Sequence, residues 1–156
     1  ALASITIGEP APDFNLQDQR GEWHTLEQHS GKWIALYFYP KDSTPGCTAE
    51  SCNLRDSYSE LTTLGFEVIG VSADSVASHQ KFISKHDLPF DLLSDTDRKV
   101  IEAYGVWGPK KFMGKEYIGI HRLTFIIDEE GVLRHIMEKV KTKTHHEDVL
   151  EIIANL

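Results

Sequence analysis

Two cysteines, Cys47 and Cys52, are the residues of this 156-residue chain best suited to chemistry. Cys47 follows Thr44-Pro45-Gly46, where a buried strand is expected to give way to a helix. Unpaired backbone N–H groups and the positive dipole at a helix N-terminus stabilise a thiolate, the nucleophilic form of cysteine. A helix terminus contributes at most about 2 kcal/mol, so a reactive Cys47 requires a second cation nearby.

The spacing between the two cysteines limits how they can react with each other. If both are helical, they lie about 140° apart around the helix axis and ~7.5 Å apart along it, so their Cα atoms are roughly 8–9 Å apart. A disulfide spans at most about 7 Å between Cα atoms. The spacing therefore predicts a reversible disulfide that forms only when the first turns of the helix unwind.

Structural roles compete with this interpretation. A buried cysteine is commonly a small hydrophobic residue, and Cys52, before Asn53-Leu54, fits that description. Two cysteines are too few for a disulfide scaffold. Zinc binding is disfavoured, because the pair is not a Cys-x-x-Cys hook and His145-His146 lies far along the chain. We therefore expect neither a metal nor a cofactor.

The elements that would position Cys47 alternate between strands and helices. Strands are expected in an N-terminal β-hairpin (14–16 with 23–25), at 33–39, 66–71 and 92–94, and in a late hairpin (123–127 with 132–136). Helices are expected from near Cys47 to Leu64, from Val76 onward, from Asp95 to Tyr104 and from His145 to Leu156. This order predicts an α/β fold with a central mixed sheet and helices on both faces.

Length and charge restrict the classes of protein further. At 17.6 kDa, with no repeat and no long linker, residues 1–156 are expected to form one domain. The formal net charge of -8 argues against nucleic acid and anionic membrane surfaces as partners. The longest apolar run, 33–39, is too short to span a membrane. A soluble cytoplasmic protein is expected.

The segment from Pro40 to Cys47 matches the Pro-x-x-x-Thr-x-x-Cys signature of the peroxiredoxins, and Glu50 and Cys52 continue it. Nearly the whole chain resembles the bacterioferritin comigratory protein, or Q-type, subfamily, including residues 104–108, 112–115, 119–122, 125–128 and 144–146. The resemblance implies a thioredoxin-like fold and a thiol-specific peroxidase.

The same resemblance implies a reaction cycle. Cys47 would be the peroxidatic cysteine, which attacks hydrogen peroxide or an organic hydroperoxide and becomes a sulfenic acid. Cys52 would be the resolving cysteine, which condenses with it to an intramolecular disulfide. Thioredoxin would regenerate the thiols, with glutaredoxin as the alternative reductant, and the enzyme would be a monomer.

Four further residues receive roles from the resemblance. Thr44 would hydrogen-bond the thiolate and the peroxide, and Arg122 would supply the missing cation. Pro40 would shield the sulfur from water, and Glu50 would orient the arginine. Each also has an ordinary explanation. Thr44 could be a turn residue and Arg122 a surface charge. Pro40 could simply end a strand, and Glu50 could be an acidic residue favoured in the first turn of a helix.

Two other functions compete with the peroxidase. A thioredoxin-like disulfide oxidoreductase would share the placement of a cysteine between strand and helix. The chain, however, has no Cys-x-x-Cys, and it has no proline after Pro109 to supply the cis-proline usual in that class. The other alternative is a redox-sensing or partner-binding domain whose disulfide is only a switch. Peroxide consumption with a thioredoxin system separates the three.

Overall fold

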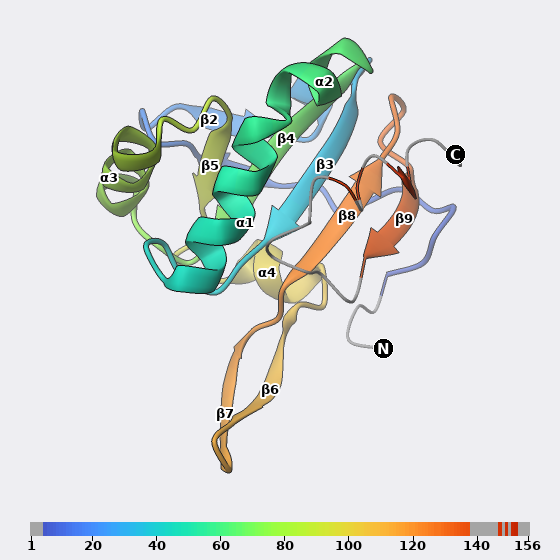
Figure 1. Ribbon diagram of the computed structural model, residues 1–156. Coiled ribbons are helices and arrows are strands. Elements are labelled where there is room, and N and C mark those ends of the chain that lie inside the picture. The colour runs from blue at the N-terminus through green and yellow to red at the C-terminus, as the bar shows by residue number, and fades with distance from the viewer. Residues whose placement is uncertain (1–4, 138–146, 148, 150, 153–156) are drawn as a thin grey trace.

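A seven-stranded mixed sheet forms the centre of the molecule in the order β2-β1-β5-β4-β3-β8-β9 (Figure 1). The computed structural model describes residues 5–137, 147, 149, 151 and 152. The strands of the sheet are β1 (Asn15–Gln17), β2 (Trp23–Thr25), β3 (Trp33–Phe38), β4 (Phe66–Ser72), β5 (Asp91–Ser94), β8 (Leu123–Ile127) and β9 (Leu133–Met137). The three strands β3, β4 and β5 are parallel, whereas β8 is antiparallel to both β3 and β9.

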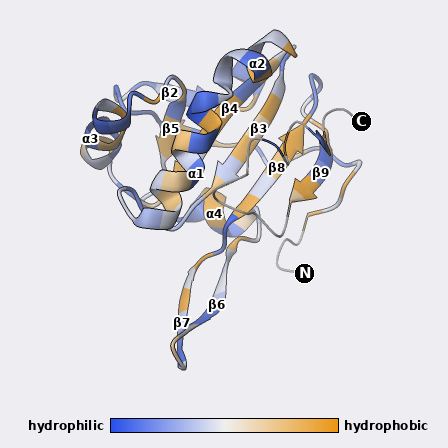
Figure 2. Ribbon diagram, viewed as in Figure 1, coloured by the Kyte–Doolittle hydropathy of each residue, from blue (hydrophilic) through white to orange (hydrophobic). Residues whose placement is uncertain are grey.

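Alternate residues of β3 supply the two cores of the protein. Ile34, Leu36 and Phe38 face the core covered by α4 (Lys99–Ala103), whereas Ala35 and Tyr37 face the other core. This second core is covered by α1 (Pro45–Asp56), α2 (Tyr58–Thr63) and α3 (Val76–His86), and it contains Cys47. Figure 2 shows apolar residues along the central strands and hydrophilic residues on the outer sides of these helices. The α/β class and the helices on both faces are confirmed.

Gly70 is placed where the central strands approach closely. It pairs with Tyr37 of β3 and Leu92 of β5. A Cβ atom at this position would lie 2.6 Å from Leu92 Cδ2 and 2.8 Å from Tyr37 Cζ. The strand therefore needs a residue without a side chain at this point.

Several predicted helices differ in extent from those of the structure. The helix expected from Cys47 to Leu64 is two helices, because the chain leaves helical geometry at Ser57, where φ is -111° and ψ is 9°. The helix expected from Asp95 begins only at Lys99, because the Asp95 carboxylate accepts the Ile101 N–H at 2.7 Å and Arg98 adopts a φ of 61°. The last helix, predicted over 145–156, lies mostly outside the described residues.

The hairpin of β6 (Trp107–Phe112) and β7 (Lys115–Ile120) was not predicted. It extends away from the main sheet as a separate two-stranded ribbon (Figure 1). Met113 and Gly114 connect its strands with φ values of 51° and 81°. Positive φ at both central residues is the requirement of a type I′ hairpin turn. The hairpin leads directly into Arg122.

Candidate active site

The N-terminus of α1 places Cys47 at the edge of the second core. Thr44 is the N-cap residue, with φ -81° and ψ 153°, and Pro45 begins the helix with a φ suited to that position. The Thr48 N–H donates the first helical hydrogen bond to the Thr44 carbonyl at 2.8 Å. Cys47 lies in the first turn and is 1% exposed. The expected position of a cysteine at a helix start is confirmed.

Arg122 joins Cys47 to Glu50. Its Nη2 donates to Cys47 Sγ at 3.3 Å, and its Nη1 donates to Glu50 Oε1 at 2.7 Å. The Glu50 side chain is 0% exposed and that of Arg122 is 20% exposed. Burial disfavours the charge of Arg122, but the neighbouring Glu50 carboxylate and Cys47 raise the pKa of Arg122 above its usual range. The structure therefore places a permanent cation beside the sulfur.

Lys110 of β6 is a second cation near this site, and sequence reasoning missed it. Its Nζ donates to the Ile120 carbonyl at 2.8 Å, two residues before Arg122. Burial and the charge of Arg122 lower the pKa of Lys110, while Cys47 acts in the opposite direction. Gly119 leaves room for the lysine, since a Cβ there would lie 3.2 Å from Lys110 Cδ. Only the pairing of β6 with β7 brings Lys110 near Arg122, and that pairing was not predicted from the sequence.

The remaining predicted site residues surround the start of α1. Cys52 lies on the same helix, is partly exposed, and is a free thiol like Cys47. Pro40 is partly buried, and a single residue, Tyr39, separates it from the end of β3. The Thr44 hydroxyl donates to the Lys41 carbonyl at 2.8 Å, so its proton is directed at the loop rather than at Cys47. The structure thus brings Cys47, Glu50 and Arg122 into direct contact.

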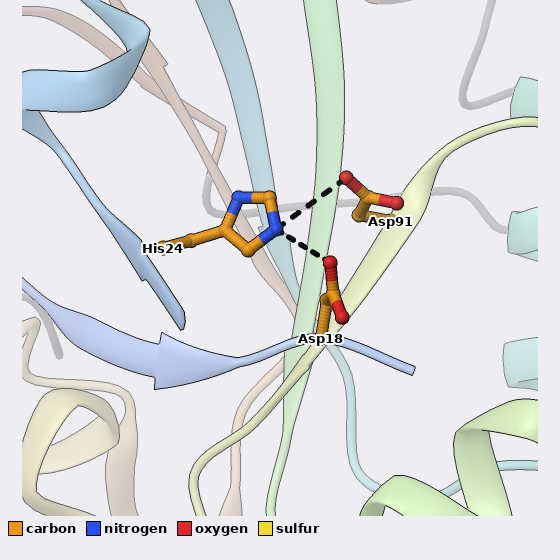
Figure 3. Close-up of side chains that lie close together, drawn as sticks. All are labelled: Asp18, His24 and Asp91. Carbon is orange, nitrogen blue, oxygen red and sulfur yellow. Dashed lines mark hydrogen bonds and ion pairs between the residues drawn. The ribbon is translucent and has the colours of Figure 1, made fainter. Parts of the chain in front are cut away.

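A separate group of polar residues lies at the other end of the parallel strands. Asp18, His24 and Asp91 are the one group among the described residues whose side chains could together hold a metal ion (Figure 3). Both carboxylates already have a cationic partner, because Arg20 Nη2 lies 2.9 Å from Asp18 and 3.4 Å from Asp91. His24 Nε2 lies 2.6 Å from Asp18 Oδ2. We interpret this group as an ion cluster that fastens the β1–β2 hairpin to β5.

Comparison with known proteins gives consistent matches over most of the chain. Residues 7–136 match the AhpC/TSA family. Peroxiredoxin Bcp of Bacillus subtilis is 49% identical over 153 residues, which is 98% of each chain, and that of Escherichia coli K12 is 48% identical over 146 residues, 94% of each. A solved structure of the Xanthomonas campestris bacterioferritin comigratory protein is 38% identical with a TM-score of 0.85, covering 91% of this chain and 90% of the other.

Proposed function

The chain belongs to the AhpC/TSA family as a peroxiredoxin of the Bcp/PrxQ group, and from this premise we propose that Cys47 and Cys52 carry its thiol peroxidase cycle. Its fold is the thioredoxin-like fold expected for that family. The observation that supports the assignment of residues is the guanidinium of Arg122, which bridges Cys47 Sγ and the buried Glu50 carboxylate. Peroxides are its substrates.

In the first step the Cys47 thiolate attacks one oxygen of the peroxide. The S–O bond forms as the O–O bond breaks, so that Cys47 becomes a sulfenic acid and the departing oxygen takes up a proton to leave as water or an alcohol. Negative charge develops on both oxygens, and the positive charge of Arg122 is placed to stabilise it. We include organic hydroperoxides because the related Xanthomonas protein has alkyl peroxide reduction activity.

In the second step the Cys52 thiol attacks the Cys47 sulfenic acid, which releases water and forms the disulfide. Both cysteines lie within α1, whose helical geometry separates their Cα atoms by roughly 8–9 Å. The first turns of α1 must therefore unwind before a bond of normal geometry can form. Amide hydrogen exchange should accelerate over residues 45–52 on oxidation, whereas unchanged protection there would contradict this step.

A dithiol reductant completes the cycle, and we propose thioredoxin in this role. It transfers two electrons and two protons to the disulfide, returns both cysteines to thiols and becomes a disulfide itself. Because both cysteines belong to one helix, a monomer can complete every step. A reducing compartment, the cytoplasm, would keep the reductant supplied. No helix in the described part of the chain is long and apolar enough to cross a membrane.

Two cysteine variants test the assignment. Cys47→Ser should abolish peroxide consumption, because serine is not ionised at neutral pH. Cys52→Ser should complete one turnover and then accumulate the sulfenic acid, detectable by mass spectrometry after one equivalent of peroxide. Substantial activity in the Cys47 variant would overturn the assignment, and full thioredoxin-dependent turnover in the Cys52 variant would make Cys52 a structural residue.

A further inference from the structure

The loop from Pro40 to Thr44, between β3 and α1, is held by buried polar side chains that the proposed cycle does not use. At their centre are Asp42 and His79 of α3, whose side chains are 2% and 0% exposed. His79 Nδ1 lies 2.7 Å from Asp42 Oδ2. The Ser78 hydroxyl donates to the same oxygen at 2.9 Å, and the Tyr39 hydroxyl donates to Oδ1. Three side chains therefore converge on one carboxylate.

The neighbours of His79 determine where its protons lie. Nε2 is 3.1 Å from the Leu93 carbonyl oxygen, which can only accept, so Nε2 carries a hydrogen. On the other side, Nδ1 and Asp42 Oδ2 form a hydrogen bond between two buried side chains. Burial raises the pKa of Tyr39 well above its usual range, so its hydroxyl remains a donor to Asp42. The bond between α3 and the loop is thus shielded from water, which strengthens it.

The loop next to this bond has an unfavourable backbone conformation. Ser43 has a φ of 62°, in the left-handed region that residues other than glycine disfavour. The chain is fixed on both sides of it: the Asp42 N–H donates to Asp74 Oδ2 at 2.8 Å, and the Thr44 hydroxyl donates to the Lys41 carbonyl at 2.8 Å. Such a conformation persists only where its surroundings hold it.

We propose that His79 is a positioning residue for the peroxide reaction: through Asp42 it holds loop 40–44 in the form that starts α1 at Thr44 and keeps Cys47 beside Arg122. The inference rests on the proposed function. The same bond sets where the unwinding of α1 stops. Residues from Pro45 onward can unwind, whereas Asp42 stays attached to α3. Loss of the His79–Asp42 bond should therefore slow the peroxide step and accelerate disulfide formation.

Two substitutions of His79 separate positioning from core packing. In His79→Asn the amide nitrogen can take the place of Nδ1 and donate to Asp42. In His79→Gln the longer side chain can take the place of Nε2 and donate to the Leu93 carbonyl, without a donor for Asp42. Each variant keeps one of the two contacts of the imidazole ring. Ser78→Ala, which removes a single partly buried donor to Asp42, is a milder third variant.

The rates of the two steps are measured separately by stopped-flow tryptophan fluorescence of the reduced proteins mixed with hydrogen peroxide. We expect His79→Asn to react with peroxide within about threefold of the wild-type rate and His79→Gln to react at least tenfold more slowly, since only the first keeps a donor to Asp42. His79→Gln should also form the disulfide faster. Ser78→Ala should change both rates in the same directions, by less.

Urea unfolding of the same proteins supplies the control. A residue that only fills the core would lower the unfolding midpoints of both His79 variants and leave the rates of the folded proteins unchanged, which would overturn the proposal. If neither His79 variant folds, wild-type rates in Ser78→Ala would overturn it instead. A wild-type protein that consumes no peroxide with dithiothreitol as reductant would refute the proposed function itself, a result distinct from any of these.

Discussion

Replacement of Arg122 by methionine should lower both the stability of the protein and the reactivity of the Cys47 sulfur. Arg122→Met leaves the Glu50 carboxylate, 0% exposed, without its cation. Removing one partner of a buried ion pair typically costs 3–5 kcal/mol, and because Arg122 is itself 20% exposed we expect about 3 kcal/mol. Urea unfolding at neutral pH measures this loss.

The effect on sulfur follows from the contact between Arg122 and Cys47. At 3.3 Å and an effective dielectric constant of about 20, Coulomb's law gives roughly 5 kcal/mol between unit charges. After the loss of solvation, a hydrogen bond to a charged group contributes a net of about 1.5–3 kcal/mol. We therefore expect the reaction of Cys47 with peroxide to slow by about 10- to 100-fold.

The double variant Arg122→Met/Glu50→Gln distinguishes the two effects. A neutral amide at position 50 removes the buried negative charge that Arg122 no longer offsets, so most of the lost stability should return. The peroxide rate should stay low, because the cation beside Cys47 is still absent. Arg134→Met is the matched control, since it removes a guanidinium whose side chain is 46% exposed and paired with Asp128.

Stopped-flow fluorescence with hydrogen peroxide at several pH values is the assay for all four proteins. A double variant that regains stability and also reacts at the wild-type rate would refute the role of Arg122. A control variant that slows as much as Arg122→Met would show that the effect is one of net charge on the chain rather than of local contact.

Two further predictions concern stability. Gly70→Ala should lower the free energy of unfolding by about 1–3 kcal/mol, because its Cβ would lie 2.6 Å from Leu92 Cδ2; a change below about 0.5 kcal/mol in urea would contradict this packing. The hydrogen bond from His29, together with Lys32, lowers the pKa of Glu67 below its usual 4.5 despite partial burial, so its stabilisation is present above pH 4.5 and is lost as pH falls through the folded-state value. Glu67→Gln should flatten the decline of unfolding free energy between about pH 5 and pH 3, and a slope equal to that of the wild type would disprove this linkage.

Much of the sheet was predictable because its signals are local. The apolar run at 33–39 and the late hairpin at 123–136 carry their strand patterns within a few residues. The strands of the N-terminal hairpin were located to within one residue. The β6–β7 hairpin was not, because its exposed residues give no alternation of apolar and polar side chains. Its turn is formed by Met113-Gly114 rather than a common Asn-Gly or Asp-Gly pair.

The active site was predictable only in part from the residues themselves. The start of α1 just before Cys47 follows from Thr44-Pro45-Gly46, since capping depends on neighbouring residues. The need for a cation could be calculated, but its identity as Arg122 required the family resemblance, because no local pattern relates residues 75 positions apart. The roles of Lys110, Asp42 and His79 depend on tertiary contacts alone, and the sequence carries no sign of them.

The distance along the chain between Cys47 and Arg122 has a consequence for biosynthesis. The two residues are 75 positions apart, and they meet only after β8, which follows Arg122, has paired with β3. A nascent chain that has emerged from the ribosome only as far as α4 contains Cys47 but not yet Arg122, the cation that we propose to activate its sulfur. We expect this contact to form late in folding, because the entropy cost of closing so long a loop must be met before the contact contributes any stability. If Arg122 activates Cys47 as proposed, we expect chains still under synthesis to react with peroxide at Cys47 more slowly than the folded protein does.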